Sequence, residues 1–335
     1  FAGDHEETES VSLANKEKNH KNEFRRKIAN TFLEEYEGTK NLKIPSIIAK
    51  NKTTGKPITP WLSQLFTAYK IKTEPYFANF NGTGAGKTLA AIITSKTIDA
   101  KITVVVCPNA ILDQWHDEAE KCFEGNVTVS GKDAFYEKYE NGKSKFLIIN
   151  WDKLNQDDSE DWVRTLAEQQ IDLFVLDEIH FSKNEKSIRF KNMGWLLSEA
   201  RKKNPNLKVL AMTATPIVND LAEGKTQLQL ITGKKYNDLK TTPYTDNAIA
   251  LWEKFTSIDI RHKPEYANII TEEVDVFAKT PTEQELKHLT SNPLAIEQFL
   301  TDARIPEIIK RINGPTVIYS DYVGAVKALP GHKAI

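Results

Sequence analysis

The sequence has little cysteine, no long apolar run and no excess of charge of one sign. Two cysteines among 335 residues, Cys107 and Cys122, are too few for a disulfide framework. They favour a reducing intracellular compartment, the cytoplasm or the nucleus. No apolar run approaches the ~18 residues of a membrane-spanning helix, so no membrane partner is expected. No cysteine or histidine spacing is typical of a zinc site. The 45 basic and 46 acidic residues neither require nor exclude a nucleic-acid partner.

The sequence pattern divides the chain into three parts. Residues 1–58 form a charged helical N-terminal extension, residues 59–270 a first lobe, and residues 271–335 a linker with the truncated start of a second lobe. The chain begins at Phe1 instead of methionine and ends soon after one predicted strand of the second lobe. This organisation predicts a fragment of a longer protein.

One helix is predicted in the N-terminal extension. Phe24, Ile28, Phe32 and Tyr36 recur every four residues and form one apolar stripe. Two interpretations stay open, a helix that docks on the first lobe and a basic arm that binds nucleic acid.

From residue 59 onward, short apolar runs alternate with amphipathic ones. Strands are predicted near residues 102–106, 146–149, 173–176 and 207–212, and helices near residues 87–98, 110–122, 159–169, 187–200, 220–231 and 247–255. Further strands are expected at residues 272–277 and 316–319, with helices at residues 282–289 and 306–312. Continuous apolar strands that alternate with helices predict an α/β fold with a parallel, doubly wound sheet.

A glycine-rich loop at residues 81–88, Asn-Gly-Thr-Gly-Ala-Gly-Lys-Thr, is the strongest motif. Its glycines let the backbone curl around phosphate oxygens, and the next helix adds the positive end of its dipole. Lys87 is expected to reach the β- and γ-phosphates of ATP, and Thr88 to ligate Mg²⁺. The predicted nucleotide-binding residues of this loop are Gly82, Thr83, Gly84, Ala85, Gly86, Lys87 and Thr88.

An acidic pair, Asp177 and Glu178, follows an apolar strand. Asp177 is expected to hold Mg²⁺ through water, and Glu178 to polarise the attacking water, so Lys87 and Glu178 are the predicted catalytic residues. Alone, the pair would be equally compatible with surface charge, but the phosphate loop upstream favours the catalytic interpretation. His180 either couples the nucleotide to the lobe or simply precedes a helix.

Two threonines follow the strand at residues 207–212. The hydroxyls of Thr213 and Thr215 are expected to hydrogen-bond to the Asp177–Glu178 segment when nucleotide is bound, and so to couple binding to movement. The alternative is a plain turn between strand and helix that Thr215 caps.

Together these residues resemble the superfamily-two helicases, and among them the Swi/Snf-type translocases of double-stranded DNA. The resemblance covers residues 60–319, and the order and spacing of its motifs are more specific than any single one. The motifs are the phosphate loop, Gln114-Trp115, residues 148–154, Asp177-Glu178-Ile179-His180 and Thr213-Ala214-Thr215-Pro216.

Four positions distinguish the chain from the usual patterns. Asn81 stands where Swi/Snf proteins usually carry aspartate and general phosphate loops carry glycine, while Thr83 looks more like a helicase. Ile179 replaces a small residue. Ala214 replaces the usual Swi/Snf glycine, as in many strand-separating or restriction-system motors. The subfamily therefore stays open.

The resemblance implies two RecA-like lobes that close on ATP while the cleft between them moves along nucleic acid. It implies that Gln64 reads adenine, the alternative being a polar residue of a buried helix. An arginine late in the second lobe normally stabilises the transferred phosphoryl group, a contribution of about 10³ to 10⁵ in rate. Hydrolysis by residues 1–335 alone is therefore expected barely above background.

Nucleic-acid contacts are implied by the same resemblance. Loops after the strands of the first lobe are expected to contact phosphates without reading sequence, through Pro108, Asn109 and Asn150. Trp115 and Trp151 are expected to pack in the interior instead of stacking on bases.

The favoured function is an ATP- and Mg²⁺-dependent translocase on double-stranded DNA. One alternative is a strand-separating DNA or RNA helicase or a restriction-type motor subunit, and another is an inactive nucleotide-gated scaffold. The scaffold interpretation is disfavoured because the residues expected for catalysis are all present, namely Lys87, Thr88, Asp177 and Glu178.

Overall fold

The computed structural model of the chain describes residues 4–51, 54–136, 143–156, 159–263, 273–291 and 293–312. The chain divides into two units, residues 1–265 and residues 266–335.

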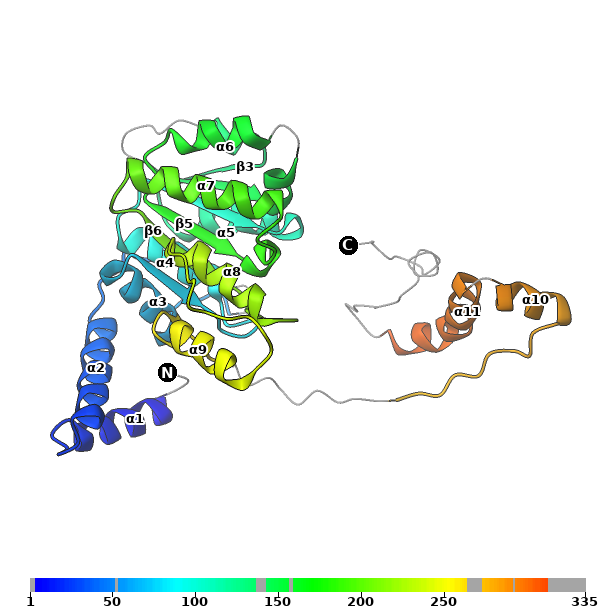
Figure 1. Cartoon of the computed structure of the whole chain (residues 1–335), viewed down its shortest axis with the longest axis horizontal. Coiled ribbons are helices and arrows are strands. Elements are labelled where there is room, and N and C mark those ends of the chain that lie inside the picture. Colours follow the sequence, from blue (N-terminus) through cyan, green and yellow to red (C-terminus); the bar gives the residue numbers. More distant parts are fainter. Residues whose placement is uncertain are drawn as a thin grey trace. The chain divides into compact units, whose positions relative to one another are not determined.

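A seven-stranded sheet with all strands parallel forms the centre of the first unit (Figure 1). The strand order is β3-β4-β2-β5-β6-β1-β7. The strands are β1 (Tyr76–Asn79), β2 (Ile102–Cys107), β3 (Asn126–Ser130), β4 (Ser144–Asn150), β5 (Leu173–Asp177), β6 (Lys208–Met212) and β7 (Asp259–Ile260). The predicted α/β fold with a parallel sheet is confirmed, while β1, β3 and β7 were not expected from the sequence.

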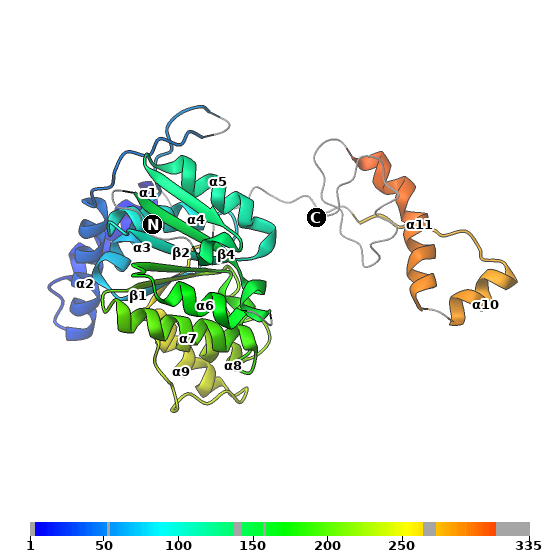
Figure 2. The ribbon, with the colours of Figure 1, turned by 90° about the horizontal axis from the view of Figure 1, so that it is seen from above.

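Helices cover both faces of this sheet, which makes the fold doubly wound (Figure 2). One face carries α3 (Leu62–Thr73), α4 (Lys87–Thr97) and α5 (Leu112–Cys122). The other face carries α6 (Ser159–Ala167), α7 (Ile188–Lys203), α8 (Leu221–Thr232) and α9 (Thr245–Thr256). Short 3₁₀ helices are η1 (Asn109–Ile111), η2 (Asp133–Phe135), η3 (Trp151–Asn155) and η4 (Ile179–Ser182).

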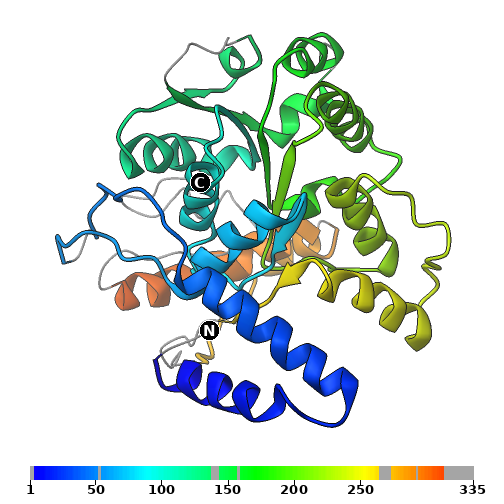
Figure 3. The same cartoon turned by 90° about the vertical axis from the view of Figure 1, so that its left-hand side faces the viewer.

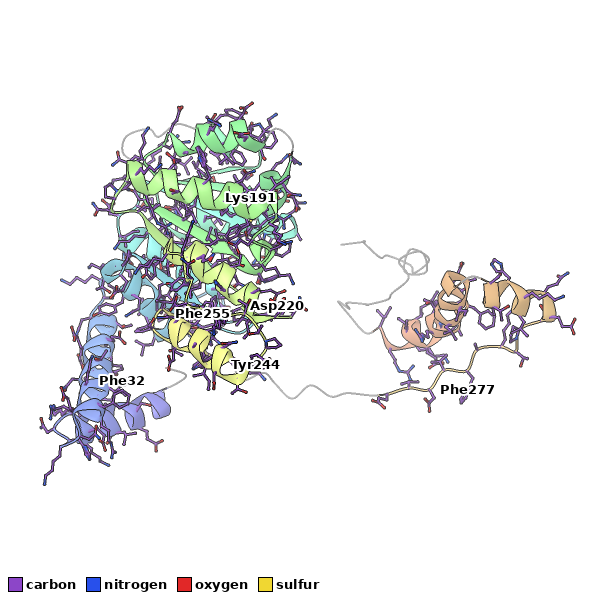
Figure 4. The ribbon with its side chains drawn as sticks, viewed as in Figure 1. Phe32, Lys191, Asp220, Tyr244, Phe255 and Phe277 are labelled. Carbon is purple, nitrogen blue, oxygen red and sulfur yellow. The ribbon has the colours of Figure 1, made fainter. Side chains whose placement is uncertain are left out.

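Two apolar layers hold these helices on the sheet. Along β2, Val104 belongs to the layer under α6–α9 and Val105 to the layer under α3–α5, since successive strand side chains point to opposite faces. Both faces are covered, so the central strands are mainly apolar on both sides. Phe255 anchors α9 edge-on against Phe80, with ring centroids 5.6 Å apart, and Tyr244 before α9 stays exposed (Figure 4).

The N-terminal extension forms a helical hairpin of α1 (Asp4–Glu17) and α2 (Glu23–Lys40) (Figure 3). Helix α2 docks on α3 through a 2.9 Å ion pair between Glu35 and Lys70. Only the C-terminal half of the predicted apolar stripe is covered, because Tyr36 is buried whereas Phe24 and Ile28 are exposed.

The second unit contains α10 (Glu283–Ser291) and α11 (Pro293–Arg311). A strand was predicted at residues 272–277, but residues 273–280 form neither helix nor strand, so this prediction is wrong for residues 273–277. The side chain of Phe277 is exposed. The strand predicted at residues 316–319, which would open the second lobe, lies outside the described residues. Within the described ranges, every helix is too short or too polar to span a membrane.

Candidate nucleotide site

The sheet brings the predicted motifs to one edge. The last residues of β1, β6 and β5 are in register, since Asn79 pairs with Met212 and Met212 pairs with Asp177. The phosphate loop follows β1, and Thr213 follows β6. Asp177 is the last residue of β5, and Glu178 comes directly after it. The carboxyl ends of parallel strands are the usual place for ligands in α/β sheets.

The backbone of the phosphate loop depends on two glycines with left-handed conformation, Gly84 at φ 76° and Gly86 at φ 66°. Gly86 is the N-cap of α4, so the helix begins at Lys87. The first N–H groups of a helix have no partner within it, and they carry the positive end of its dipole. The loop therefore presents donors to an anion.

Gln64 braces this loop from α3. Its side-chain nitrogen donates a 3.1 Å hydrogen bond to the carbonyl of Gly86, and its oxygen accepts one of 2.9 Å from the backbone N–H of Trp61. The side chain is buried. Its predicted contact with adenine stays a prediction.

Lys87 faces the acidic pair. Its ammonium donates to the carbonyls of Asn81 and Gly82 at 3.0 and 3.2 Å. Burial lowers the pKa of Lys87, while the charges of Glu178 and Asp177 oppose this shift. The charges of one cation and two carboxylates therefore influence one another.

Asp177 is held by two buried tryptophans. The indole N–H of Trp115 donates to its Oδ2 at 2.7 Å, and that of Trp151 donates to its backbone carbonyl at 2.7 Å. Burial raises the pKa of Asp177 to about 6, although the Trp115 hydrogen bond acts in the opposite direction. The predicted interior packing of both indoles is confirmed. Their hydrogen bonds were missed, although a buried indole N–H signals that an acceptor must lie nearby.

Glu178, Thr213 and His180 form a triangle beside this carboxylate. The Thr213 hydroxyl donates to Glu178 Oε2 at 2.7 Å, and His180 Nδ1 lies 3.0 Å from that hydroxyl and 3.2 Å from Glu178 Oε2. Since the hydroxyl has one hydrogen, the network assigns a proton to His180 Nδ1. Burial favours the neutral acid, but the bonds from His180 and Thr213 hold the pKa of Glu178 below its ordinary value.

Thr215 is less directly placed than Thr213. Its backbone N–H donates to the Thr213 hydroxyl at 3.1 Å, and the residue is exposed. Thr213 thus contacts the acidic pair directly, and Thr215 only through Thr213.

The candidate nucleic-acid residues lie at the ends of two neighbouring strands. Asn150, at the end of β4, donates from its side chain to Asn109 Oδ1 at 2.7 Å, and its own Oδ1 accepts from the backbone N–H of Lys153 at 2.9 Å. Asn150 is buried, Pro108 half-buried and Asn109 exposed. Of the three, Asn109 is the most accessible to a phosphate.

The donor set fits a magnesium–triphosphate group. In the described part of the chain, no three His, Cys, Asp or Glu side chains gather as a metal site. Mg²⁺ bound with a nucleotide needs only one or two protein ligands, because water and phosphate oxygens supply the others. Thr88, in the first turn of α4, and Asp177, at the end of β5, are the two residues that would hold the ion, and this role stays a prediction.

The chain was compared with known protein families and structures. A family model described as the res subunit of type III restriction enzymes matches residues 65–218, a range that contains all three motifs. No curated protein sequence matches the chain.

A solved structure shares this fold, and a second was matched over part of the chain. The SWI2/SNF2 ATPase core of Sulfolobus solfataricus, solved with dsDNA, is 18% identical with a TM-score of 0.50, and the match covers 66% of this chain and 46% of that one. The UvsW helicase of bacteriophage T4 is 17% identical with a TM-score of 0.38, covering 53% and 59%. The matches thus span about half the length of these proteins, 46% and 59%.

Proposed function

We propose that the chain is a helicase-type protein of superfamily two, an ATP- and Mg²⁺-dependent motor that moves along double-stranded DNA. The convergence of Lys87, Asp177 and Glu178 at one sheet edge carries this proposal. A motor of this class needs a phosphate loop and an acidic pair at one site, and a connection from that site to the rest of the lobe.

Binding is the task of the phosphate loop. The free N–H groups at the start of α4 bind phosphate oxygens, and the Lys87 ammonium exchanges the carbonyls of Asn81 and Gly82 for the β- and γ-phosphates. When bound with the nucleotide, Mg²⁺ neutralises charge on the phosphates.

Hydrolysis is the task of Glu178. Its carboxylate is kept ionised by Thr213 and His180 and polarises the attacking water. Because Thr213 follows β6 while Glu178 follows β5, a change in what Glu178 contacts reaches the segment after β6. We propose that this connection couples the nucleotide state to movement.

Nucleotide binding is the first test, because it does not depend on turnover. Lys87→Ala is expected to weaken binding of a fluorescent ATP analogue at least ~10-fold, since charge-assisted contacts to phosphate are lost. Lys96→Ala is the matched control, because it removes the same charge from the last turn of the same helix. Equal losses in the two variants would contradict the proposed site.

The nucleic acid is identified by a second set of assays. In a protein that carries both lobes, double-stranded DNA is expected to stimulate ATP hydrolysis more than single-stranded DNA or RNA. If backbone phosphates are neutralised, log affinity for duplex DNA falls with log salt by about 0.9 per contact. A response that does not depend on salt would exclude tracking along the backbone.

A restriction-type motor that separates strands is the second candidate. The match to a restriction-enzyme subunit favours it, as do Thr83 and Ala214. The translocase is expected to displace the third strand of a DNA triplex and to leave a plain duplex paired. Unwinding of the plain duplex would replace the first proposal by the second.

A further inference from the structure

Two tryptophans distant in sequence from Asp177 contact different parts of it. Trp115 lies 62 residues before Asp177 and bonds its carboxylate, whereas Trp151 lies 26 residues before it and bonds its backbone carbonyl. Both side chains are 1% exposed, so neither indole is available to a base or to a partner. Each N–H therefore serves the interior of the protein.

Packing alone does not require this pairing. A buried indole N–H needs an acceptor, and a neutral carbonyl satisfies it, as Trp151 shows. Trp115 instead bonds a carboxylate whose own burial is costly. A donor of this kind compensates part of that cost and also fixes the direction of the carboxylate.

The two oxygens of Asp177 are both held. Oδ2 accepts from Trp115 at 2.7 Å, and Oδ1 accepts from the backbone N–H of Glu178 at 3.0 Å. A carboxylate has about four acceptor positions, so two stay open after these bonds. With one donor on each oxygen, rotation about the terminal side-chain bond breaks at least one of them.

We propose that Trp115 is a positioning residue for the nucleotide site, whose indole N–H orients the Asp177 carboxylate for the Mg²⁺ that accompanies ATP. The inference rests on the proposed function. Donors behind a metal-ligating carboxylate typically change metal affinity by about 10- to 100-fold when removed. Trp115 thus acts through Asp177 and touches neither nucleotide nor metal.

The test separates the metal from the nucleotide. In Trp115→Phe, the affinity for a fluorescent ATP analogue in EDTA is expected to stay within about twofold of that of the unaltered protein. The Mg²⁺ concentration at which the metal gives half of its maximal enhancement of analogue binding is expected to rise about 10-fold. Mn²⁺ binding in the presence of nucleotide, followed by electron paramagnetic resonance, is expected to weaken equally. Neither readout requires hydrolysis.

Trp151→Phe is the matched control. It removes an indole bond of the same 2.7 Å length to the same residue, but at the backbone carbonyl, so its Mg²⁺ requirement is expected to change less than the Trp115→Phe requirement. Trp115→benzothienylalanine, which replaces the N–H by sulfur in a side chain of almost the same shape, excludes a packing defect. It is expected to reproduce the metal defect of Trp115→Phe.

Two results would overturn the inference. Equal Mg²⁺ requirements in Trp115→Phe and Trp151→Phe would make Trp115 a packing residue, and so would an unchanged requirement in the benzothienylalanine protein. Failure of the unaltered protein to bind the nucleotide with Mg²⁺ would instead end the proposed function, and this inference with it.

Discussion

The side-chain oxygen of Asn81 accepts a 2.7 Å hydrogen bond from the backbone N–H of His262. The ladder between β1 and β7 thus continues into the phosphate loop, where the N–H of Gly82 donates to the carbonyl of His262 at 2.8 Å. The first residues of the loop are fixed by the segment that follows β7. Asn81, the position where the loop departs from the usual patterns, has this role.

Asn81→Ala is expected to release that segment. The N–H of His262 loses its acceptor, and the loss of this partly buried hydrogen bond costs about 1–1.5 kcal/mol. Amide hydrogen exchange at His262 should therefore become about 10-fold faster, because about 1.4 kcal/mol is a factor of ten. Asn81→Asp keeps the acceptor and is the control. Unchanged exchange in Asn81→Ala would show that the Gly82 bond alone holds the segment.

Two glycine substitutions separate backbone strain from contact with Gln64. Gly84→Ala and Gly86→Ala both place an alanine at positive φ, which costs roughly 1–2 kcal/mol. An added Cβ has open space at Gly84 but overlaps the Gln64 amide at Gly86. Denaturant unfolding should show Gly86→Ala to be the less stable variant.

A double mutant tests the cause of that difference. In the original protein, Gly86→Ala is expected to lower the free energy of unfolding more than Gly84→Ala does. In a Gln64→Ala background this difference is expected to disappear, so that the two glycine substitutions lower the free energy of unfolding equally. Additive effects of Gln64→Ala and Gly86→Ala would mean that the overlap relaxes without cost.

The main features of the fold could be predicted because the central parallel strands are mainly apolar runs. The short strands β1 and β7, with 4 and 2 residues, carry no recognisable period, and neighbouring strands define them through hydrogen bonds. In the second unit, the apolar residues at 273–277 have no such neighbour among the described residues, and no strand forms there.

The candidate site could be predicted only in part. Lys87, Asp177 and Glu178 lie in local motifs, and parallel strands bring such motifs to one edge. The bonds from Trp115 to Asp177 and from His262 to Asn81 join residues 62 and 181 positions apart, so they depend on tertiary packing that no local pattern encodes. The intracellular location and the domain limits at residues 58 and 270 stay predictions.

Glu178 has a strained backbone, with φ 49° at a residue that is not glycine. Such strain is common at functional sites, where the position of the side chain is needed for function although the backbone conformation is unfavourable. Glu178→Gly is expected to be about 0.5–1 kcal/mol more stable than Glu178→Ala, after the greater freedom of unfolded glycine is subtracted. Thermal unfolding of both variants measures this difference. Equal stability of the two variants would show that the left-handed conformation carries no strain.

Glu223, in the first turn of α8, should make stability depend on pH. Lys183 pairs with its carboxylate at 2.9 Å, and the backbone N–H groups of Val218 and Asn219 donate to it at 3.1 Å. Burial opposes its ionisation, but these bonds prevail and lower its pKa from the ordinary 4.5 to about 2. Because the folded state favours the ionised acid, this stabilisation is complete above pH 4.5 and is lost as pH falls toward 2.

Urea unfolding of Glu223→Gln against the unaltered protein isolates this contribution, because all other titrating groups are common to both. At pH 6 the variant is expected to be about 2–3 kcal/mol less stable, and the difference should shrink steadily below pH ~4. Glu185→Gln, at an exposed position of the loop that carries Lys183, is the control and should change stability by less than about 0.5 kcal/mol. A difference that stays constant from pH 6 to pH 3 would assign the loss to packing, since only an ionised carboxylate in the folded state gives a loss that follows pH.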